Sequence, residues 1–176
     1  GVEADHNLFD AKLPEAGTLT ILVDPEGNIY LDMAGQHTRK ALIEDMNEQF
    51  PMGLNEEEKL KFSIAGAFGV PRNQMKRWLE LPSSERNKLV MPGVPSDSTN
   101  NELGSWIHNA RLAQFRMKQE GVVTDEYVIV VKADQDTPYP AIQKVINTLV
   151  DINVNKFNLI TSQETDPSKI NAELQK

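Results

Sequence analysis

The chain has 176 residues, of which 39% are hydrophobic and 25% are charged, a balance typical of a globular protein rather than a disordered one. Its net charge of −8 argues against a nucleic-acid binder and against docking on anionic lipid, because both need clustered cations. The sequence has no cysteine, which excludes disulfides, cysteine-based metal sites and thiol catalysis.

The first third of the chain predicts a linker followed by a β-hairpin. Residues 1–17 show no sustained hydrophobic period and are rich in acidic residues, which indicates an extended, flexible linker. Thr18–Val23 is β-branched and apolar, and Asn28–Met33 alternates apolar and polar residues. The segment Asp24-Pro25-Glu26-Gly27-Asn28 between them has the residues of a tight turn. Two strands around such a turn form a hairpin.

The middle of the chain is helix-compatible. We expect a helix over 38–50 and two short helices near 55–66 and 71–80, with Pro71 opening the last one and Pro82 ending it. Residues 91–101 are rich in Pro, Ser and Asn and predict a loop.

A strong amphipathic helix is predicted over 102–119. Ser98, Thr99 or Asn100 is expected to cap it, and Gly121 to end it in a left-handed turn. Trp106 lies on its apolar stripe and is expected in the core, as is Trp78 on an earlier helix. The stripe consists of Leu103, Trp106, Ile107, Ala110, Ala113 and Met117.

The last third reads as strand, helix, strand. Tyr127–Lys132 is a continuous apolar run, Tyr139–Ile152 has one apolar helical face, and Lys156–Thr161 alternates. This is the length of a βαβ unit with parallel strands. The predicted fold class is therefore α+β: a small mixed β-sheet with helices on one face.

The loop 132–140 is the strongest candidate for chemistry. Asp134, Asp136 and Tyr139 follow a strand of a predicted parallel sheet, where a hard cation or acid–base chemistry could be placed. A structural interpretation needs fewer assumptions: Thr137 caps the next helix, Pro138 is its first residue, and Asp136 favours its positive end.

The remaining signals for chemistry are weak. His6, His37 and His108 are scattered and have no neighbours at metal-ligand spacing, so we expect them to be ordinary surface residues. Gly66 and Gly69 match only part of a dinucleotide fingerprint. We therefore predict no catalytic residues, no metal, no cofactor and no enzymatic activity.

Residues 128–164 resemble the C-terminal signature of the ExbD/TolR family of biopolymer-transport proteins. In this signature an apolar strand leads to a basic-x-Asp motif, a polar loop ending in Tyr, an amphipathic helix and a last strand ending in a Leu-[Ile/Val]-Thr motif. The hairpin and the helix over 101–118 are similar to the first elements of the family, and Leu13-Pro14 weakly matches a linker motif. The matching positions are Lys132, Asp134, Tyr139, Val145, Ile146, Asn147, Leu149, Phe157, Leu159, Ile160 and Thr161.

The resemblance implies the periplasmic domain of a single-pass inner-membrane protein, whose transmembrane helix and proton-carrying aspartate are not in this sequence. It implies a homodimer that joins an ExbB/TolQ-like membrane subunit and binds a TonB- or TolA-like transducer in a proton-driven complex for TonB-dependent transport. A TolR-like peptidoglycan-binding domain is the alternative. The partner-facing residues it implies are Asp134, Asp136, Tyr139, Phe157, Leu159 and Ile160.

The predicted domain boundaries follow from this resemblance. A linker over 1–17 precedes an ExbD/TolR-like domain over 18–164, and a polar tail covers 165–176. Residues 35–98 depart from the family pattern and form a mostly helical insertion, which could extend the dimer interface or bind a partner of its own.

Overall fold

The computed structural model describes residues 17–123 and 126–162. The predicted polar tail, Leu13, Pro14, His6 and all of the predicted linker except Gly17 lie outside the described residues. No helix in the described ranges is long and apolar enough to cross a membrane. The elements are β1 (Thr18–Val23), β2 (Ile29–Met33), α2 (Gln36–Gln49), α3 (Glu56–Ile64), α4 (Arg72–Glu80), α5 (Ser83–Arg86), β3 (Ser96–Asp97), β4 (Asn100–Asn101), α6 (Glu102–Gln119), β5 (Val128–Asp134), α7 (Tyr139–Asp151) and β6 (Asn158–Ser162).

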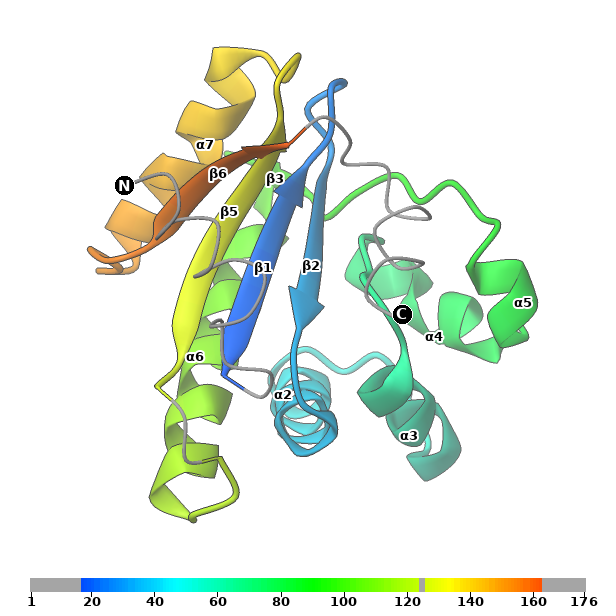
Figure 1. The fold of residues 1–176 in the computed structure, drawn as a ribbon. Coiled ribbons are helices and arrows are strands. Elements are labelled where there is room, and N and C mark those ends of the chain that lie inside the picture. Colours follow the sequence, from blue (N-terminus) through cyan, green and yellow to red (C-terminus); the bar gives the residue numbers. More distant parts are fainter. Residues whose placement is uncertain (1–16, 124–125, 163–176) are drawn as a thin grey trace.

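The main sheet has four strands in the order β2-β1-β5-β6 (Figure 1). β1 and β2 form the predicted antiparallel hairpin, with Ile21 opposite Leu31. β5 pairs in parallel with β1 on one side and with β6 on the other. The coarse prediction of an α+β fold with a small mixed sheet is thus confirmed.

The hairpin turn is held by the side chain of Asp24. Its Oδ1 accepts hydrogen bonds from the backbone N–H groups of Glu26 (3.0 Å) and Asn28 (2.8 Å), the pattern of an Asx turn. Gly27 has a φ of +85°, a conformation that a side chain rarely adopts. The tyrosine hydroxyl of Tyr30 donates to Asp24 Oδ2 at 3.1 Å and ties the turn to the sheet.

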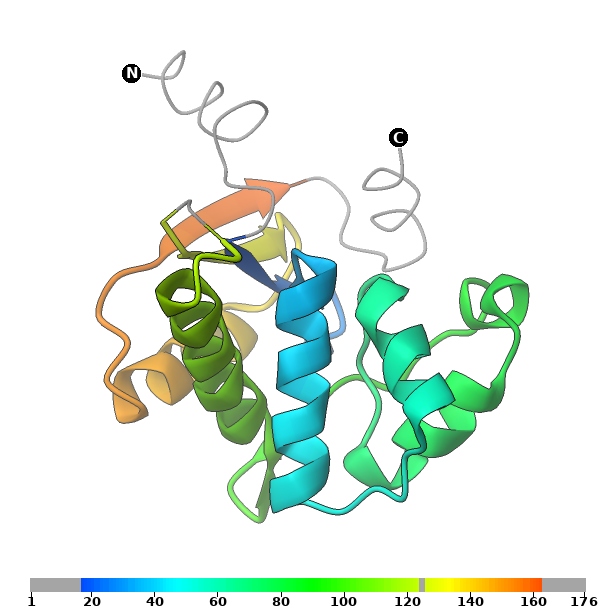
Figure 2. The ribbon, with the colours of Figure 1, turned by 90° about the horizontal axis from the view of Figure 1, so that it is seen from below.

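Helices α2, α6 and α7 cover one face of the sheet, and α3, α4 and α5 lie beyond its β2 edge (Figures 1 and 2). The core between the layers contains a cluster of three aromatic rings, Phe62, Phe68 and Trp106, with centroids 4.9 to 6.0 Å apart. Trp106 is fully buried and Trp78 is 4% exposed, so both tryptophan predictions are confirmed. Because Phe62 and Phe68 come from the predicted insertion, that segment shares the core of the sheet domain.

The insertion also closes the outer edge of β2. Leu31 exchanges two backbone hydrogen bonds of 2.8 Å with Phe68, and the N–H of Val94 donates to the carbonyl of Ile29 at 2.8 Å. Gly93 donates to Gly69, which joins the two covering segments at 2.7 Å. One of the two sheet edges is therefore occupied by the chain itself.

Several local predictions need correction. The cap of α6 is Asn101, whose side chain accepts from the N–H of Gly104 at 3.4 Å, rather than Ser98, Thr99 or Asn100. The predicted loop over 91–101 contains the small ribbon of β3 and β4. The left-handed conformation of Gly121, with φ +75°, is confirmed.

Candidate functional site

Three of the predicted site residues lie where β5 leads into α7: Asp134 ends the strand, Asp136 is in the loop and Tyr139 begins the helix. Asp134 is 5% exposed, and its Oδ1 accepts a hydrogen bond from the N–H of Asp136 at 2.8 Å. Asp136 is exposed, and so is Tyr139, whose hydroxyl donates to Gln143 at 2.6 Å. Asp134 therefore shapes the loop, while Asp136 and Tyr139 remain accessible. Within the described part of the chain, no three His, Asp or Glu side chains group as a metal site would require.

The predicted cap of the following helix is wrong. α7 begins at Tyr139, its N-cap is Pro138, and no side chain caps it. The hydroxyl of Thr137 instead donates to the carbonyls of Val23 and Asp24, each at 3.3 Å. Asp136 lies outside the first turn, which has no acidic residue. The Thr137 side chain, predicted to cap the helix, thus binds to the end of β1 instead.

Strand β6 carries the second group of predicted residues and forms an edge of the sheet. Leu159 is 51% exposed and Ile160 is half-buried. The sequence predicted Phe157 within the last strand, but in the structure it immediately precedes β6. Its side chain is partly buried against the core. Among the described residues no strand pairs with the outer side of β6, so its outward backbone groups form an open edge.

A pocket of about 600 Å³ adjoins the start of this edge, and we name it the strand-end pocket. It combines two aromatic side chains, Tyr127 and Phe157, with the amides of three asparagines. Asn158, the first residue of β6, belongs to both features. Its lining residues are Arg111, Glu126, Tyr127, Val128, Ile129, Asn153, Val154, Asn155, Lys156, Phe157 and Asn158.

The strand-end pocket is cationic although the chain is acidic. Arg111 and Lys156 line it, and its one carboxylate, that of Glu126, forms an ion pair with Lys118. This ion pair lowers the pKa of Glu126 through the Lys118 hydrogen bond and charge, so the carboxylate stays ionised. The two cations and one carboxylate that line the pocket favour acidic groups in a ligand.

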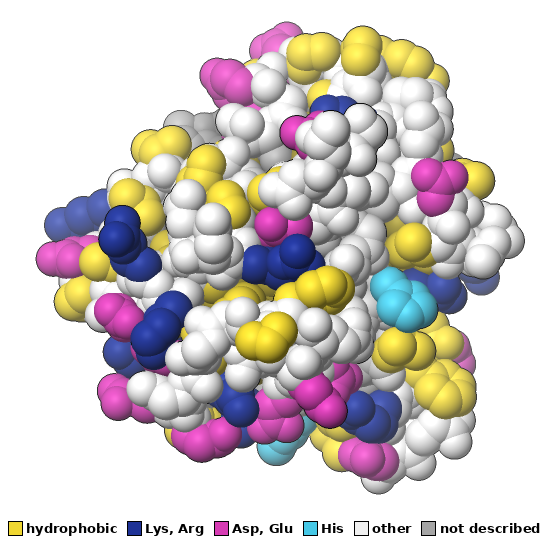
Figure 3. Space-filling view, turned by 180° about the vertical axis from the view of Figure 1, so that it is seen from behind, with side chains coloured by type: hydrophobic (Ala, Val, Ile, Leu, Met, Phe, Trp, Pro, Cys, Tyr) yellow, Lys and Arg dark blue, Asp and Glu magenta, His cyan; other side chains and the backbone are white. Residues whose placement is uncertain are grey.

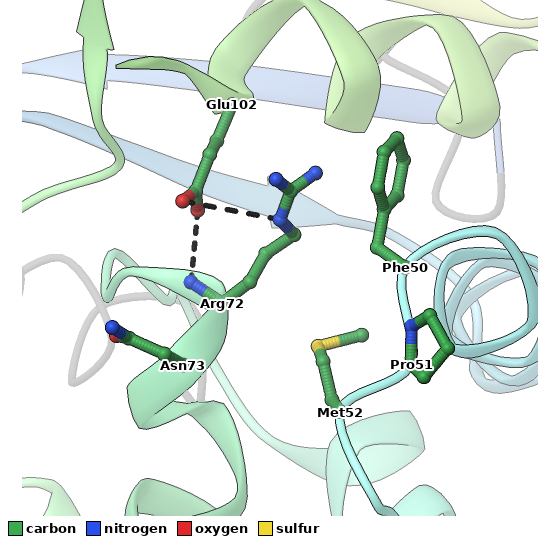
Figure 4. Close-up of a pocket in the computed structure, with 6 residues that line it drawn as sticks. All are labelled: Phe50, Pro51, Met52, Arg72, Asn73 and Glu102. Carbon is green, nitrogen blue, oxygen red and sulfur yellow. Dashed lines mark hydrogen bonds and ion pairs between the residues drawn. The ribbon is translucent and has the colours of Figure 1, made fainter.

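A second pocket, of about 380 Å³, lies where the insertion meets α6, and we name it the insertion pocket (Figure 4). It is lined by Phe50, Pro51, Met52, Arg72, Asn73 and Glu102. On the helix-covered side of the molecule, a cationic and an anionic side chain lie side by side in a hollow bordered by hydrophobic ones (Figure 3).

The backbone N–H of Arg72 donates to Glu102 Oε1 at 2.8 Å, and the Arg72 Nε lies 3.9 Å from Glu102 Oε2. Sequence reasoning missed this pocket, because its residues come from three segments that are far apart in the chain.

Comparisons with protein-family models, with curated proteins and with solved structures give no match for this chain.

Proposed function

We propose that this chain is a non-enzymatic binding module of the ExbD/TolR type, the periplasmic part of a subunit in a proton-driven inner-membrane complex. In this proposal it forms a homodimer and binds an extended segment of a TonB- or TolA-like transducer. The proposal rests on the sequence signature in residues 128–164 and, in the structure, on the open edge of β6.

The edge of β6 supports strand addition as the mode of binding. An exposed strand edge presents unpaired N–H and C=O groups, which an extended peptide or a second copy can pair with. Leu159, 51% exposed on this strand, offers apolar area that pairing would bury. Natural edge strands are commonly protected by charge, and β6 has no charged residue over Asn158–Ser162.

The insertion covers the edge of β2, which limits the proposed strand addition to the edge of β6. Phe68 and Val94 already use the outward groups of Leu31 and the Ile29 carbonyl, so a partner strand has no place there without displacing the insertion. The mixed sheet thus offers one edge of two for pairing.

The strand-end pocket supports the same surface. It includes Asn158, so its aromatic and cationic side chains lie near the first residue of the proposed pairing strand. Ligand pockets are commonly lined by aromatic side chains together with a few polar groups.

The test is binding by the whole 176-residue chain. Labelled peptides that cover the linker of a TonB-like transducer are titrated by fluorescence anisotropy, and self-association is followed by sedimentation over a range of concentrations. We expect saturable peptide binding and a concentration-dependent dimer. A protein that stays monomeric at high concentration and binds none of the peptides contradicts the proposal. Retention on purified peptidoglycan without peptide binding would favour the TolR-like alternative.

A further inference from the structure

We propose that the insertion pocket is a second binding site, in which the guanidinium of Arg72 receives a carboxylate from an acidic peptide segment. It lies on the helical side of the molecule, between the insertion and α6, and does not depend on strand addition at β6.

The Arg72 side chain is held in one orientation by two neighbours. Its guanidinium lies over the ring of Phe50, with the central carbon 3.9 Å from the ring centroid. Glu102, whose side chain is 8% exposed, accepts the backbone N–H of Arg72 and faces its Nε. Stacking and pairing fix the planar group before a ligand arrives, which lowers the entropic cost of binding.

The Nε of Arg72 forms an ion pair with Glu102 at 3.9 Å, and the terminal nitrogens of the guanidinium are further donors. Figure 4 draws no contact between these nitrogens and the other labelled residues, and no side chain or carbonyl in the described ranges accepts a hydrogen bond from them. The Arg72 side chain is 26% exposed and lines the insertion pocket. A guanidinium with its terminal N–H groups free matches the two oxygens of a carboxylate in a bidentate pair.

The walls of the pocket select a carboxylate over a phosphate. The neighbouring Glu102 carboxylate repels a dianion more than a monoanion. Pro51 and Met52 add apolar surface that suits the methylene groups of a glutamate or an apolar neighbour in a peptide. A volume of about 380 Å³ is near the lower end of ligand pockets, which fits one or two residues better than a nucleotide.

The elements around the pocket position its residues firmly. Phe50 is the C-cap of α2, and its N–H donates to the carbonyl of Met46 at 2.8 Å. The N–H of Met52 donates to the Asn47 side chain at 2.9 Å. Arg72 is the first residue of α4. Phe50, Arg72 and Glu102 thus lie at helix ends, where a site is more precisely shaped than on a free loop.

The experiment follows the amide and Arg Nε–H signals of the whole chain by nitrogen-15 NMR. The probe is the peptide acetyl-Leu-Ala-Leu-Glu-amide, with its Gln counterpart and inorganic phosphate as comparisons. We expect the Glu peptide to shift the Arg72 Nε–H signal and the amides of Met52 and Asn73 in a saturable way. The Gln peptide should bind at least about tenfold more weakly, because a charge-assisted pair is lost.

The variants Arg72→Gln, Arg72→Lys and Arg77→Gln separate binding from folding. Arg77 is an exposed residue of the same helix and has no partner among the described residues, so it is the matched control. Arg72→Gln should weaken binding of the Glu peptide at least about tenfold, and Arg72→Lys should weaken it less. Arg77→Gln should leave the affinity unchanged. Equal binding of the Glu and Gln peptides, unchanged binding to Arg72→Gln, or tighter binding of phosphate than of the Glu peptide would overturn the proposal.

If the insertion pocket does not bind the Glu peptide, the proposal of strand addition at β6 still stands. A chain that binds transducer peptides at β6 but not the Glu peptide at Arg72 refutes only the second site.

Discussion

The guanidinium of Arg39 lies 3.2 Å from the carboxylate of Asp32, inside the protein, with only 3% of the Arg39 side chain exposed. Its nitrogens also donate to the carbonyls of Met33 (3.2 Å), Phe62 (2.8 Å) and Gly66 (3.0 Å). Burial lowers the pKa of Arg39 to about 10 although Asp32 opposes the shift, so the group is cationic at neutral pH. One side chain of α2 thus joins the sheet to the segment that covers its edge.

Removal of this side chain should be strongly destabilising. Arg39→Ala removes a donor from the Asp32 carboxylate and from three carbonyls, of which only that of Phe62 also accepts from the N–H of Ala65 among the contacts outside helices and strands. Breaking a buried ion pair in this way typically costs about 3–5 kcal/mol of unfolding free energy. Urea unfolding followed by tryptophan fluorescence measures the loss.

Arg77→Ala serves as the control for Arg39→Ala, because Arg77 is exposed on α4. It should change the unfolding free energy by no more than about 0.5 kcal/mol. A loss below about 1 kcal/mol for Arg39→Ala would show that this side chain does not hold the insertion to the sheet.

The same pair predicts a dependence of stability on pH. Burial raises the pKa of Asp32 above its ordinary value of 3.8, and the Arg39 charge only partly opposes this. The folded state therefore holds the proton more tightly than the unfolded state. The contribution of Asp32 to stability is full below about pH 3.8 and falls as pH rises through the folded-state pKa.

Asp32→Asn should remove this fall. The unfolding free energy of the parent minus that of Asp32→Asn should decrease as pH rises above 3.8, whatever the sign of the difference at neutral pH. Urea titrations at several pH values measure it. A difference that grows with pH would mean that the Arg39 charge outweighs burial at this carboxyl.

Two glycine substitutions test how the β2 edge is closed. A Cβ on Gly69 would collide with the ring of Tyr30 and lie 3.0 Å from the carbonyl of Ile29. Gly69→Ala should therefore cost about 1–3 kcal/mol, the usual cost of overpacking, and loosen the covering segment. Urea unfolding gives the free energy.

Gly104→Ala is the matched control. Gly104 lies in α6, and the nearest atom to its added Cβ, on Thr148, is 3.7 Å away. Alanine in a helix is favoured over glycine by up to about 1 kcal/mol, so this variant should be slightly more stable than the parent. If both variants behaved alike, the close approach of Gly69 to Tyr30 would have no energetic role.

A charge on β6 should block pairing at its edge. Leu159→Lys places a cation where a second strand would bury apolar surface, and natural edge strands use lysine in the same way. Self-association and transducer-peptide binding should both weaken by at least about tenfold, as sedimentation and anisotropy would show. Leu60→Lys, on α3, changes a leucine of similar exposure (53% against 51%) and should leave both unchanged. Equal effects of the two variants would mean that surface charge, not the β6 edge, governs association.

Local patterns were enough to predict much of the fold. The turn residues Asp24 and Gly27 marked the hairpin, and the apolar stripe through Trp106 marked a helix whose observed bounds, Glu102–Gln119, match the prediction. The alternation around Leu159 marked the last strand, although β6 begins at Asn158 rather than Lys156. In each case the period along the chain carries the information.

Features made by distant segments were not predictable in this way. Arg39 is a charged residue on a helix, and its acceptors are backbone carbonyls of residues such as Phe62 and Gly66, which have no sequence signature. The pairing of Phe68 with Leu31 is a single bridge without a strand pattern around it. The sequence predicted a local role as helix cap for Thr137, but its hydroxyl donates to carbonyls more than one hundred residues away. Tertiary contacts decide all three.

Hydrogen exchange tests most directly the proposal that a partner strand pairs with the edge of β6. Amide exchange is measured by mass spectrometry on the whole chain, at low and high concentration and with a bound transducer peptide. If pairing occurs at β6, exchange slows over Asn158–Ser162 and stays unchanged over Ile29–Met33, whose outer edge the insertion already covers. Slowed exchange over Ile29–Met33 with none over Asn158–Ser162 would contradict the account.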